Sequence, residues 1–254
     1  MKNYLYSNSN NVIIELSQVD TIYEGERVAA IQGINLKIKK GEFLCIIGPN
    51  GAGKTTLLET INGLLECTKG QTRVFGKTIK KFGCSIRKEI GYVPQEFGVD
   101  NFTPFIVKDV IMMGRFGKIG LLKSISNKDY LKVGKAIDAM EINELANRPI
   151  GKLSGGQLQK VMIARVLAKA PKILLLDEPF SNLDFKVTSE ISYKISCLHD
   201  NKNLTTLMVM HDIASIPKRC DRVILMNSGR IIKDDRPEKI LKPEFLNVAY
   251  KIKQ

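Results

Sequence analysis

Residues 48–55 constrain the fold of this chain more than any other stretch, because they place a glycine-rich loop between an apolar run and a helix-like segment. The loop reads GPNGAGKT and fits the pattern G-x-x-x-x-G-K-[ST]. It follows FLCII at 43–47, which suits a strand buried on both faces of a parallel sheet. Backbone N–H groups in such a loop wrap phosphate oxygens, and the helix N-terminus adds a favourable partial charge. The sequence therefore predicts an α/β fold with a phosphate-binding loop.

The side chains that follow the glycines in this loop supply charge and a metal ligand. Lys54 is expected to place a point charge on the β- and γ-phosphates of a nucleotide, and the Thr55 hydroxyl is placed to bind Mg²⁺. The residues expected to bind ATP here are Gly48, Pro49, Asn50, Gly51, Ala52, Gly53, Lys54, Thr55 and Thr56.

A second motif is an apolar strand that ends in two carboxylates, ILLLDE at 173–178. Carboxylates at the carboxyl end of a central strand lie beside the ligand crevice of an α/β sheet. We expect Asp177 to hold Mg²⁺ through water. Glu178 is one residue further on and is directed toward the attacking water, so it is the candidate general base.

The third motif, LSGGQ at 153–157, opens a helix. Ser154 suits the N-cap position, and the glycines expose backbone N–H groups to an anion. The phosphate loop of the same chain already holds one triphosphate. A second anion-binding helix start therefore needs another phosphate, which predicts a site shared between two chains.

Taken together, the short motifs resemble those of the nucleotide-binding subunits of ABC transporters. The motifs that carry the resemblance are GPNGAGKT at 48–55, YVPQ at 92–95, LSGGQ at 153–157, ILLLDEP at 173–179, SNLD at 181–184 and MHD at 210–212. The likeness runs from about residue 14 to 241. It implies a P-loop NTPase core with an antiparallel β subdomain and an inserted α-helical subdomain. We therefore expect a single nucleotide-binding domain over 1–254, with a helical subdomain at about 96–168 that carries LSGGQ.

The resemblance also implies roles for residues that spacing alone leaves undefined. Gln95 matches the glutamine that touches Mg²⁺ and the lytic water, and His211 matches the histidine at the γ-phosphate. Tyr23 matches the aromatic residue that stacks on adenine. In a head-to-tail homodimer, the residues expected to reach the partner's ATP are Ser154, Gly155, Gly156, Gln157 and Asp184. The expected Mg²⁺ ligands are thus Thr55, Gln95 and Asp177, and the expected catalytic residues are Glu178, His211 and Gln95.

Composition and charge narrow the setting in which such a chain works. The chain has 254 residues and no apolar run near the ~18–20 residues that span a bilayer, and its N-terminus lacks the apolar stretch of a secretory signal. Five scattered cysteines form no CxxC pair, so we expect them to be reduced and structural, with Cys45 in the core. The net charge of +13 is spread along the chain, which favours a solvated lysine-rich surface over nucleic-acid binding. We expect a peripheral protein at the cytoplasmic face of the membrane.

Hydrophobic periodicity predicts the remaining elements. Strands are expected at 12–22, 32–38, 173–176, 205–210 and 223–226, with a hairpin into 230–233; helices are expected at 54–65, 107–113, 129–140, 157–168 and from 237 onward. Residues 72–93 read as short strands with glycine breaks. His199 reads as a structural or surface residue in a polar loop.

The stretch FTPFIVKDVIMMGRFGKIGLL at 102–122 is similar to the corresponding block in ATPases of zinc and manganese importers. This block belongs to the subdomain that docks onto a membrane permease. The resemblance therefore implies a metal importer with a separate permease and, indirectly, an extracytoplasmic substrate-binding protein. Importers of iron chelates and of cobalamin share the core VxDVxxxGR and remain alternatives.

Two other classes of ATPase share the same head. DNA-repair ATPases of this type carry a long coiled coil between the phosphate loop and LSGGQ, and translation factors carry two heads on one chain. Here Lys54 and Gly151 are 97 positions apart (151 minus 54), and one head is present. A soluble ATPase of a cytosolic assembly system is the further alternative.

Overall fold

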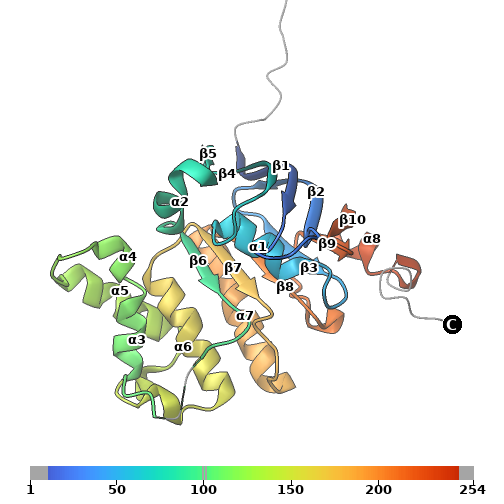
Figure 1. Cartoon of the computed structure of the whole chain (residues 1–254). Helices are drawn as coiled ribbons and strands as arrows, with labels where there is room; N and C mark the ends of the chain where they lie inside the picture. The colour runs from blue at the N-terminus through green and yellow to red at the C-terminus, as the bar shows by residue number, and fades with distance from the viewer. Residues whose placement is uncertain (1–10, 99, 101, 246–254) are drawn as a thin grey trace, which may run out of the picture.

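The computed structural model describes residues 11–98, 100 and 102–245 (Figure 1). The strands are β1 (Val12–Thr21), β2 (Ile31–Lys39), β3 (Phe43–Ile47), β4 (Lys69–Val74), β5 (Lys77–Thr78), β6 (Ile90–Val93), β7 (Ile173–Asp177), β8 (Thr205–Val209), β9 (Arg222–Asn227) and β10 (Arg230–Asp235). The α-helices are α1 (Lys54–Asn62), α2 (Ile79–Arg87), α3 (Val107–Met113), α4 (Phe116–Ile119), α5 (Asn127–Met140), α6 (Gly155–Ala168), α7 (Phe185–Lys202) and α8 (Pro237–Ile240). Single 3₁₀ turns lie at Asn143–Leu145, Ile150–Lys152 and Ile213–Ser215. Within these ranges no helix combines the length and the apolar character that crossing a bilayer requires.

The centre of the molecule is a six-stranded sheet in the order β10-β9-β3-β8-β7-β6. Every neighbouring pair is parallel except β9 and β10, which form the expected hairpin. Strands β3 and β7 are buried at all five positions, as strands covered on both faces must be. Their carboxyl ends lie near each other at one edge of the sheet, where the site described below is assembled.

Alternate residues of β3 enter two different hydrophobic cores. Phe43, Cys45 and Ile47 pack with helices α3, α5, α6 and α7. Leu44 and Ile46 point the other way and pack with α1 and the inner face of the second sheet. The period of two along a strand thus divides the apolar residues between both faces of the sheet.

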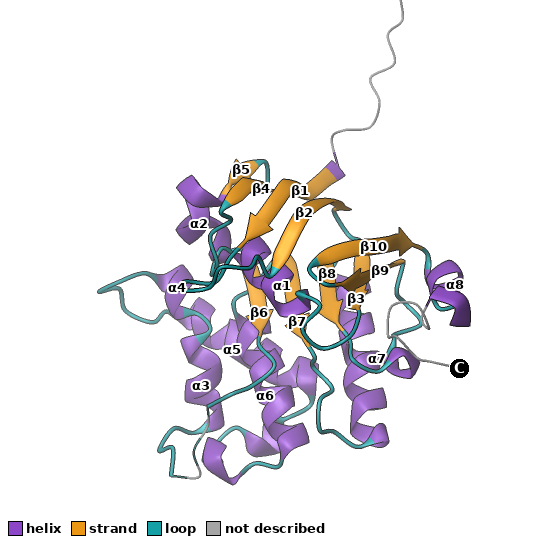
Figure 2. Ribbon diagram, turned by 45° about the vertical axis from the view of Figure 1, so that its right-hand side comes forward, coloured by secondary structure: helices purple, strands orange, loops and turns teal. Residues whose placement is uncertain are grey.

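The second sheet is antiparallel, in the order β2-β1-β4-β5, and α1 contacts strands of both sheets (Figures 1 and 2). Leu57, Leu58 and Ile61 of α1 are fully buried in this layer. Helix α1 begins at Lys54, directly after the phosphate loop, so its packing between the sheets fixes the position of that loop.

On the opposite side of the central sheet, α3, α5 and α6 pack together and project away from the sheet edge (Figure 2). Helix α5 begins with a capping box, in which Ser126 and Asp129 satisfy each other's backbone groups. Arg115 contacts Asp129 at 2.9 Å and joins α4 to this unit. The unit carries LSGGQ at the start of α6.

Most predicted elements are confirmed to within two residues, but two regions were predicted wrongly. Residues 79–87 form helix α2, whereas 72–93 was expected to contain only strands. The buried residues Ile79 and Ile86 are seven apart, so the helical period was present but was hidden by Gly83. Helix α7 was not predicted either, and it contains His199.

His199 lies inside α7 and is 2% exposed, so the prediction of a polar loop was wrong. Its Nδ1 shares a hydrogen bond with Thr206 Oγ1 at 3.0 Å, and its ring is 5.0 Å from that of Phe43. Burial lowers the pKa of this imidazole. The residue is therefore a neutral core histidine, and it plays a structural part as expected.

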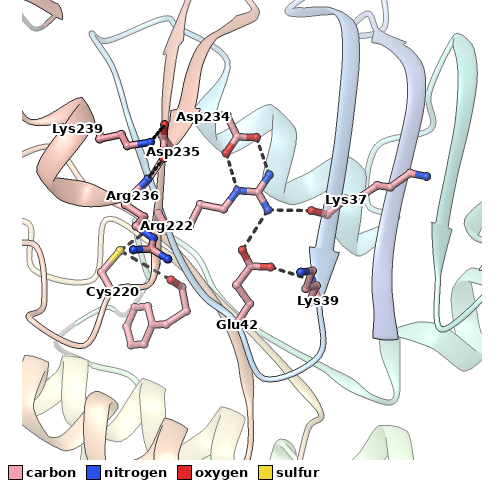
Figure 3. Close-up of polar contacts among 10 residues, drawn as sticks. Lys37, Lys39, Glu42, Cys220, Arg222, Asp234, Asp235, Arg236 and Lys239 are labelled. Atoms are coloured by element: carbon pink, nitrogen blue, oxygen red, sulfur yellow. Dashed lines mark hydrogen bonds and ion pairs between the residues drawn. The ribbon is translucent and has the colours of Figure 1, made fainter. Parts of the chain in front are cut away.

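Arg222 at the start of β9 links the two sheets (Figure 3). Its guanidinium contacts both carboxylate oxygens of Asp234 at 2.5 Å, Glu42 Oε1 at 3.0 Å and the Lys37 carbonyl oxygen at 2.9 Å. The hydrogen bonds to Asp234 and Glu42 raise the pKa of the guanidinium further above its already high value. This fork joins β9 and β10 to the β2–β3 turn.

We expect Arg222→Met to lower the free energy of unfolding by about 2–4 kcal/mol, because it leaves two partly buried carboxylates without their cation. Urea unfolding followed by circular dichroism measures the change. Arg219→Met is the matched control: Arg219 also contacts two carboxylates, but at a more exposed position, where ion pairs contribute about 0–1 kcal/mol. Equal effects of the two substitutions would contradict the linking role of Arg222.

Candidate nucleotide site

The phosphate loop joins β3 to α1 and needs glycine at two of its positions. Gly48 has φ +150°, and a Cβ there would lie 2.2 Å from the Met226 carbonyl oxygen. Gly53 has φ +91°, and its Cβ would meet the Ala30 carbonyl oxygen at 2.6 Å. A side chain at either position would collide with backbone, so the loop adopts its shape only with these glycines.

Lys54 is held inside the loop and is 6% exposed. Its Nζ donates hydrogen bonds to the carbonyl oxygens of Gly48 at 2.9 Å and Pro49 at 3.0 Å. Burial lowers the pKa of the ammonium, while the charges of Glu178 and Asp177 act in the opposite direction. The loop is therefore closed around a cation, as an anion-binding cradle requires.

Asp177 ends strand β7 next to this loop and is 1% exposed. Neither of its carboxylate oxygens has a hydrogen-bond partner of normal geometry among the described residues. Burial raises the pKa of this carboxyl to about 6, and the neighbouring charge of Glu178 adds to the rise, although the Thr55 hydroxyl lies close enough to lower it. A buried carboxylate with no partner fits the ligand set of a hard divalent cation such as Mg²⁺.

Glu178 follows directly and adopts a positive φ of 45°. Its Oε2 accepts hydrogen bonds from Gln95 Nε2 at 2.9 Å and from Ser181 Oγ at 3.1 Å. Gln95 comes from the end of β6, so residues 83 positions apart meet at the carboxyl end of the sheet. The contact from Ser181 was not predicted. Its signal in the sequence was only the turn spacing of three residues.

Two adjoining cavities contain most of the predicted site. One, of about 520 Å³, is lined by Tyr23, Ala30, residues 50–56, Gln95, Glu178 and His211. The other, of about 550 Å³, extends from Gln95, Glu178 and His211 toward Phe180 and Phe185. The three residues predicted to be catalytic therefore face both cavities, and the structure brings them together with the phosphate loop.

Tyr23 lies after β1 at the rim of the first cavity. Its hydroxyl shares a hydrogen bond with Thr56 Oγ1 at 3.0 Å and contacts Glu59 Oε2 at 3.5 Å. The ring is 38% exposed, so it presents an aromatic surface beside the phosphate loop.

The LSGGQ residues are not part of either cavity. Ser154 and Gln157 form a capping box: Gln157 N–H donates to Ser154 Oγ at 3.4 Å, and Ser154 N–H donates to Gln157 Oε1 at 3.1 Å. Asp184 likewise caps α7 by accepting a hydrogen bond from Val187 N–H at 2.9 Å. Within one chain, these residues form a surface of their own, apart from the phosphate loop.

Gly156 fixes how this surface packs, because a Cβ there would lie 2.8 Å from Val187 Cγ1. We expect Gly156→Ala to destabilise the chain by about 1–3 kcal/mol through overpacking. Gly155→Ala is the matched control, since its Cβ would only touch Leu183 at 3.9 Å. Melting temperatures of the two variants, and of Gly156→Ala in a Val187→Ala background, measure the clash. Failure of Val187→Ala to relieve the loss would contradict this steric account.

The same chain matches the family model for ABC transporters over residues 31–181, more than half of its length. The chain belongs to the ABC transporter family. Proteins of this family bind and hydrolyse ATP, so the chain is an ATPase, and its fold has the P-loop NTPase core that the sequence predicted.

Three known proteins illustrate the similarity of this ABC ATPase. The manganese transport system ATP-binding protein MntB of Halalkalibacterium halodurans is 36% identical over 94% of both chains. The chelated iron transport system membrane protein YfeB of Yersinia pestis is 38% identical over 78% of this chain and 66% of its own. A dimeric, post-hydrolysis structure of the ATP-binding cassette MJ0796 with ADP and Pi has a TM-score of 0.76 at 29% identity, covering 89% of this chain and 99% of that one.

Proposed function

We propose that this ABC ATPase powers the import of a metal ion of the zinc or manganese type through a separate permease. The observation that carries the proposal is the similarity, over 94% of both chains, to a manganese transport system ATP-binding protein. The residues at 102–122 add to it, because they were similar to the block found in such importers before any comparison was made. The whole of 1–254 is then one nucleotide-binding domain, with the helical subdomain at about 96–168.

In this proposal the phosphate loop binds the triphosphate of ATP through its backbone N–H groups and Lys54, and Tyr23 stacks on adenine. Asp177, Thr55 and Gln95 hold Mg²⁺, and the unpartnered oxygens of Asp177 support that assignment. When bound, Mg²⁺ neutralises charge on the phosphate oxygens. Lys54 then exchanges its bonds to the Gly48 and Pro49 carbonyl oxygens for bonds to phosphate.

Hydrolysis is assigned to Glu178, His211 and Gln95. Glu178 takes the proton of the attacking water, and the hydrogen bonds from Gln95 and Ser181 orient its carboxylate. His211 faces the same cavity from the end of β8 and contacts the γ-phosphate. Because Gln95 also reaches the second cavity, it lies where nucleotide state and a docked partner would both be sensed.

Each complete ATP site is proposed to form between two copies of the chain. Ser154, Gly155, Gly156, Gln157 and Asp184 would contact the ATP held by the phosphate loop of the partner. The separation of these residues from both cavities in one chain supports this arrangement, since they have no nucleotide of their own to contact. The similarity to a dimeric cassette supports it as well.

The permease is proposed to dock on the helical subdomain and to hold the ATPase at the cytoplasmic face of the membrane. Apolar side chains are exposed along this stretch, which marks an interaction surface. They are Phe102, Phe105, Phe116, Leu121 and Leu122, with exposed fractions of 48–99%. An extracytoplasmic binding protein would deliver the metal to the permease, and nucleic acid has no part in this proposal.

The proposal is tested by deleting the gene in the organism that makes the protein. We expect manganese or zinc uptake, measured as cell-associated metal by mass spectrometry, to fall and to recover with the parent gene but not with a Glu178→Gln copy. Normal uptake of both metals in the deletion strain would refute the metal assignment.

Import of chelated iron is the second candidate, and the similarity to YfeB favours it. The same deletion strain separates the two functions. Loss of iron accumulation from a chelate, with manganese and zinc uptake unchanged, would select this alternative.

A further inference from the structure

A cavity of about 770 Å³ lies between the end of α1, strand β4 and helix α2. These three elements are in contact with one another in the upper part of the molecule (Figure 1). The lining of this cavity shares no residue with the two cavities of the nucleotide site. The nucleotide functions described above therefore make no use of it.

The charge of the cavity wall is predominantly positive. Lys69, Lys80, Lys81 and Arg87 line it, and the wall has one carboxylate, that of Glu66. Glu66 Oε1 lies 2.9 Å from Lys80 Nζ, so this carboxylate is already matched. Among the described residues, none of the other three cations is paired with a carboxylate. The wall is therefore suited to an anion.

Arg87 is held at the wall by neutral acceptors. Its Nη1 donates to the Gly63 carbonyl oxygen at 2.7 Å, and its Nη2 contacts Cys84 Sγ at 3.4 Å. These contacts fix the guanidinium in place without neutralising its charge. A guanidinium held in this way loses little side-chain freedom when it binds a carboxylate or a phosphate.

Thr72 on β4 adds a polar group that has no partner. It lines the cavity, is 4% exposed, and its Oγ1 makes no hydrogen bond within the described part of the chain. A buried hydroxyl left unpaired costs about 1–3 kcal/mol, so such groups are normally satisfied. An oxygen of a bound anion would remove this cost.

The rest of the wall is apolar and would accept a carbon skeleton. Ile79 and Phe82 of α2 lie on it, and the ammonium group of Lys81 is 5.6 Å from the centre of the Phe82 ring. We propose that this cavity is a binding site for a small organic anion, a carboxylate or a phosphate ester. Its charged group would lie toward Lys81, Arg87 and Thr72, and its carbon atoms toward Ile79 and Phe82.

Two cysteines of the cavity wall, Cys67 and Cys84, report on occupancy. The experiment uses the full chain saturated with Mg-ADP, so that the phosphate loop is filled, and measures iodoacetamide alkylation of each cysteine by mass spectrometry. Succinate and glycerol 3-phosphate are the two probes, which distinguish a carboxylate from a phosphate ester, with sodium chloride at matched ionic strength as reference. We expect one probe to slow alkylation of both cysteines by about threefold at twice its dissociation constant.

Cys197 on α7 lies outside the cavity and serves as the internal control, with an unchanged rate expected. Lys81→Gln should abolish the protection, whereas Lys88→Gln, which removes a charge just after the same helix but outside the cavity, should keep it. The proposal is overturned if neither probe protects Cys67 and Cys84 more than Cys197, or if protection persists in Lys81→Gln.

Discussion

A Glu178→Gln variant should bind ATP as tightly as the parent chain, while its steady-state hydrolysis falls by a factor of ~10² or more. The amide is nearly isosteric with the carboxylate, and its oxygen still accepts the hydrogen bonds from Gln95 and Ser181, so the geometry of the site is kept. What is lost is the ability to take a proton from water. Phosphate release measures hydrolysis, and fluorescent-nucleotide titration measures binding.

The same variant should accumulate as an ATP-bound dimer in size-exclusion chromatography, because the step that separates the two chains is blocked. Glu144→Gln, which removes an exposed carboxylate from a distant 3₁₀ turn, is the matched control and should turn over normally. Near-normal hydrolysis by Glu178→Gln would remove Glu178 from the role of general base.

An Asp177→Asn variant should lose hydrolysis by a comparable factor and yet gain stability without nucleotide. The folded chain holds the Asp177 proton more tightly than the unfolded chain, because burial raises this pKa from 3.8 to about 6. The free energy of unfolding of the parent therefore falls as pH rises from about 4 to 6 and stays low above that range. Asparagine does not ionise, so the variant escapes this loss.

The expected gain above pH 6 is about 2 kcal/mol, or roughly 4–8 °C in melting temperature, and it should vanish near pH 4. Thermal unfolding of both proteins across this pH range measures the difference. Asp138→Asn, an exposed change on α5, should show no such pH-dependent gain. An Asp177→Asn curve parallel to that of the parent at every pH would show that the carboxylate carries no such strain.

Much of the fold could be predicted because the sequence signals for it are local. Strand β3 reads as an unbroken apolar run, and α3 was predicted at its observed bounds from the spacing of its buried residues. Helices α2 and α7 were missed for a different reason. Each has an apolar stripe of the right period, but many polar residues surround it and little of it is buried. Tertiary packing decides such cases, and His199 shows the result, since a histidine among polar neighbours is buried by the sheet beneath it.

The candidate site shows the same division. The phosphate loop and the Asp177–Glu178 pair follow from spacing within one segment, and the structure places them as expected. The hydrogen bond between Gln95 and Glu178 joins distant segments and could be anticipated only through the resemblance. The unpartnered state of Asp177 depends on which groups surround it in space, so no reading of residues 173–178 could have supplied it.

The order of strands in the central sheet bears on how the protein is made. Strand β3 carries the phosphate loop at its end, but its neighbours are β8 and β9, so Phe43 pairs with Thr206 and Leu44 with Arg222. Even within the loop, Ala52 relies on the Gly229 N–H, which donates to its carbonyl oxygen at 3.2 Å. A chain emerging from the ribosome therefore cannot hold a nucleotide until residues beyond 229 have left the exit tunnel. Translation that stops early would release a fragment unable to consume ATP.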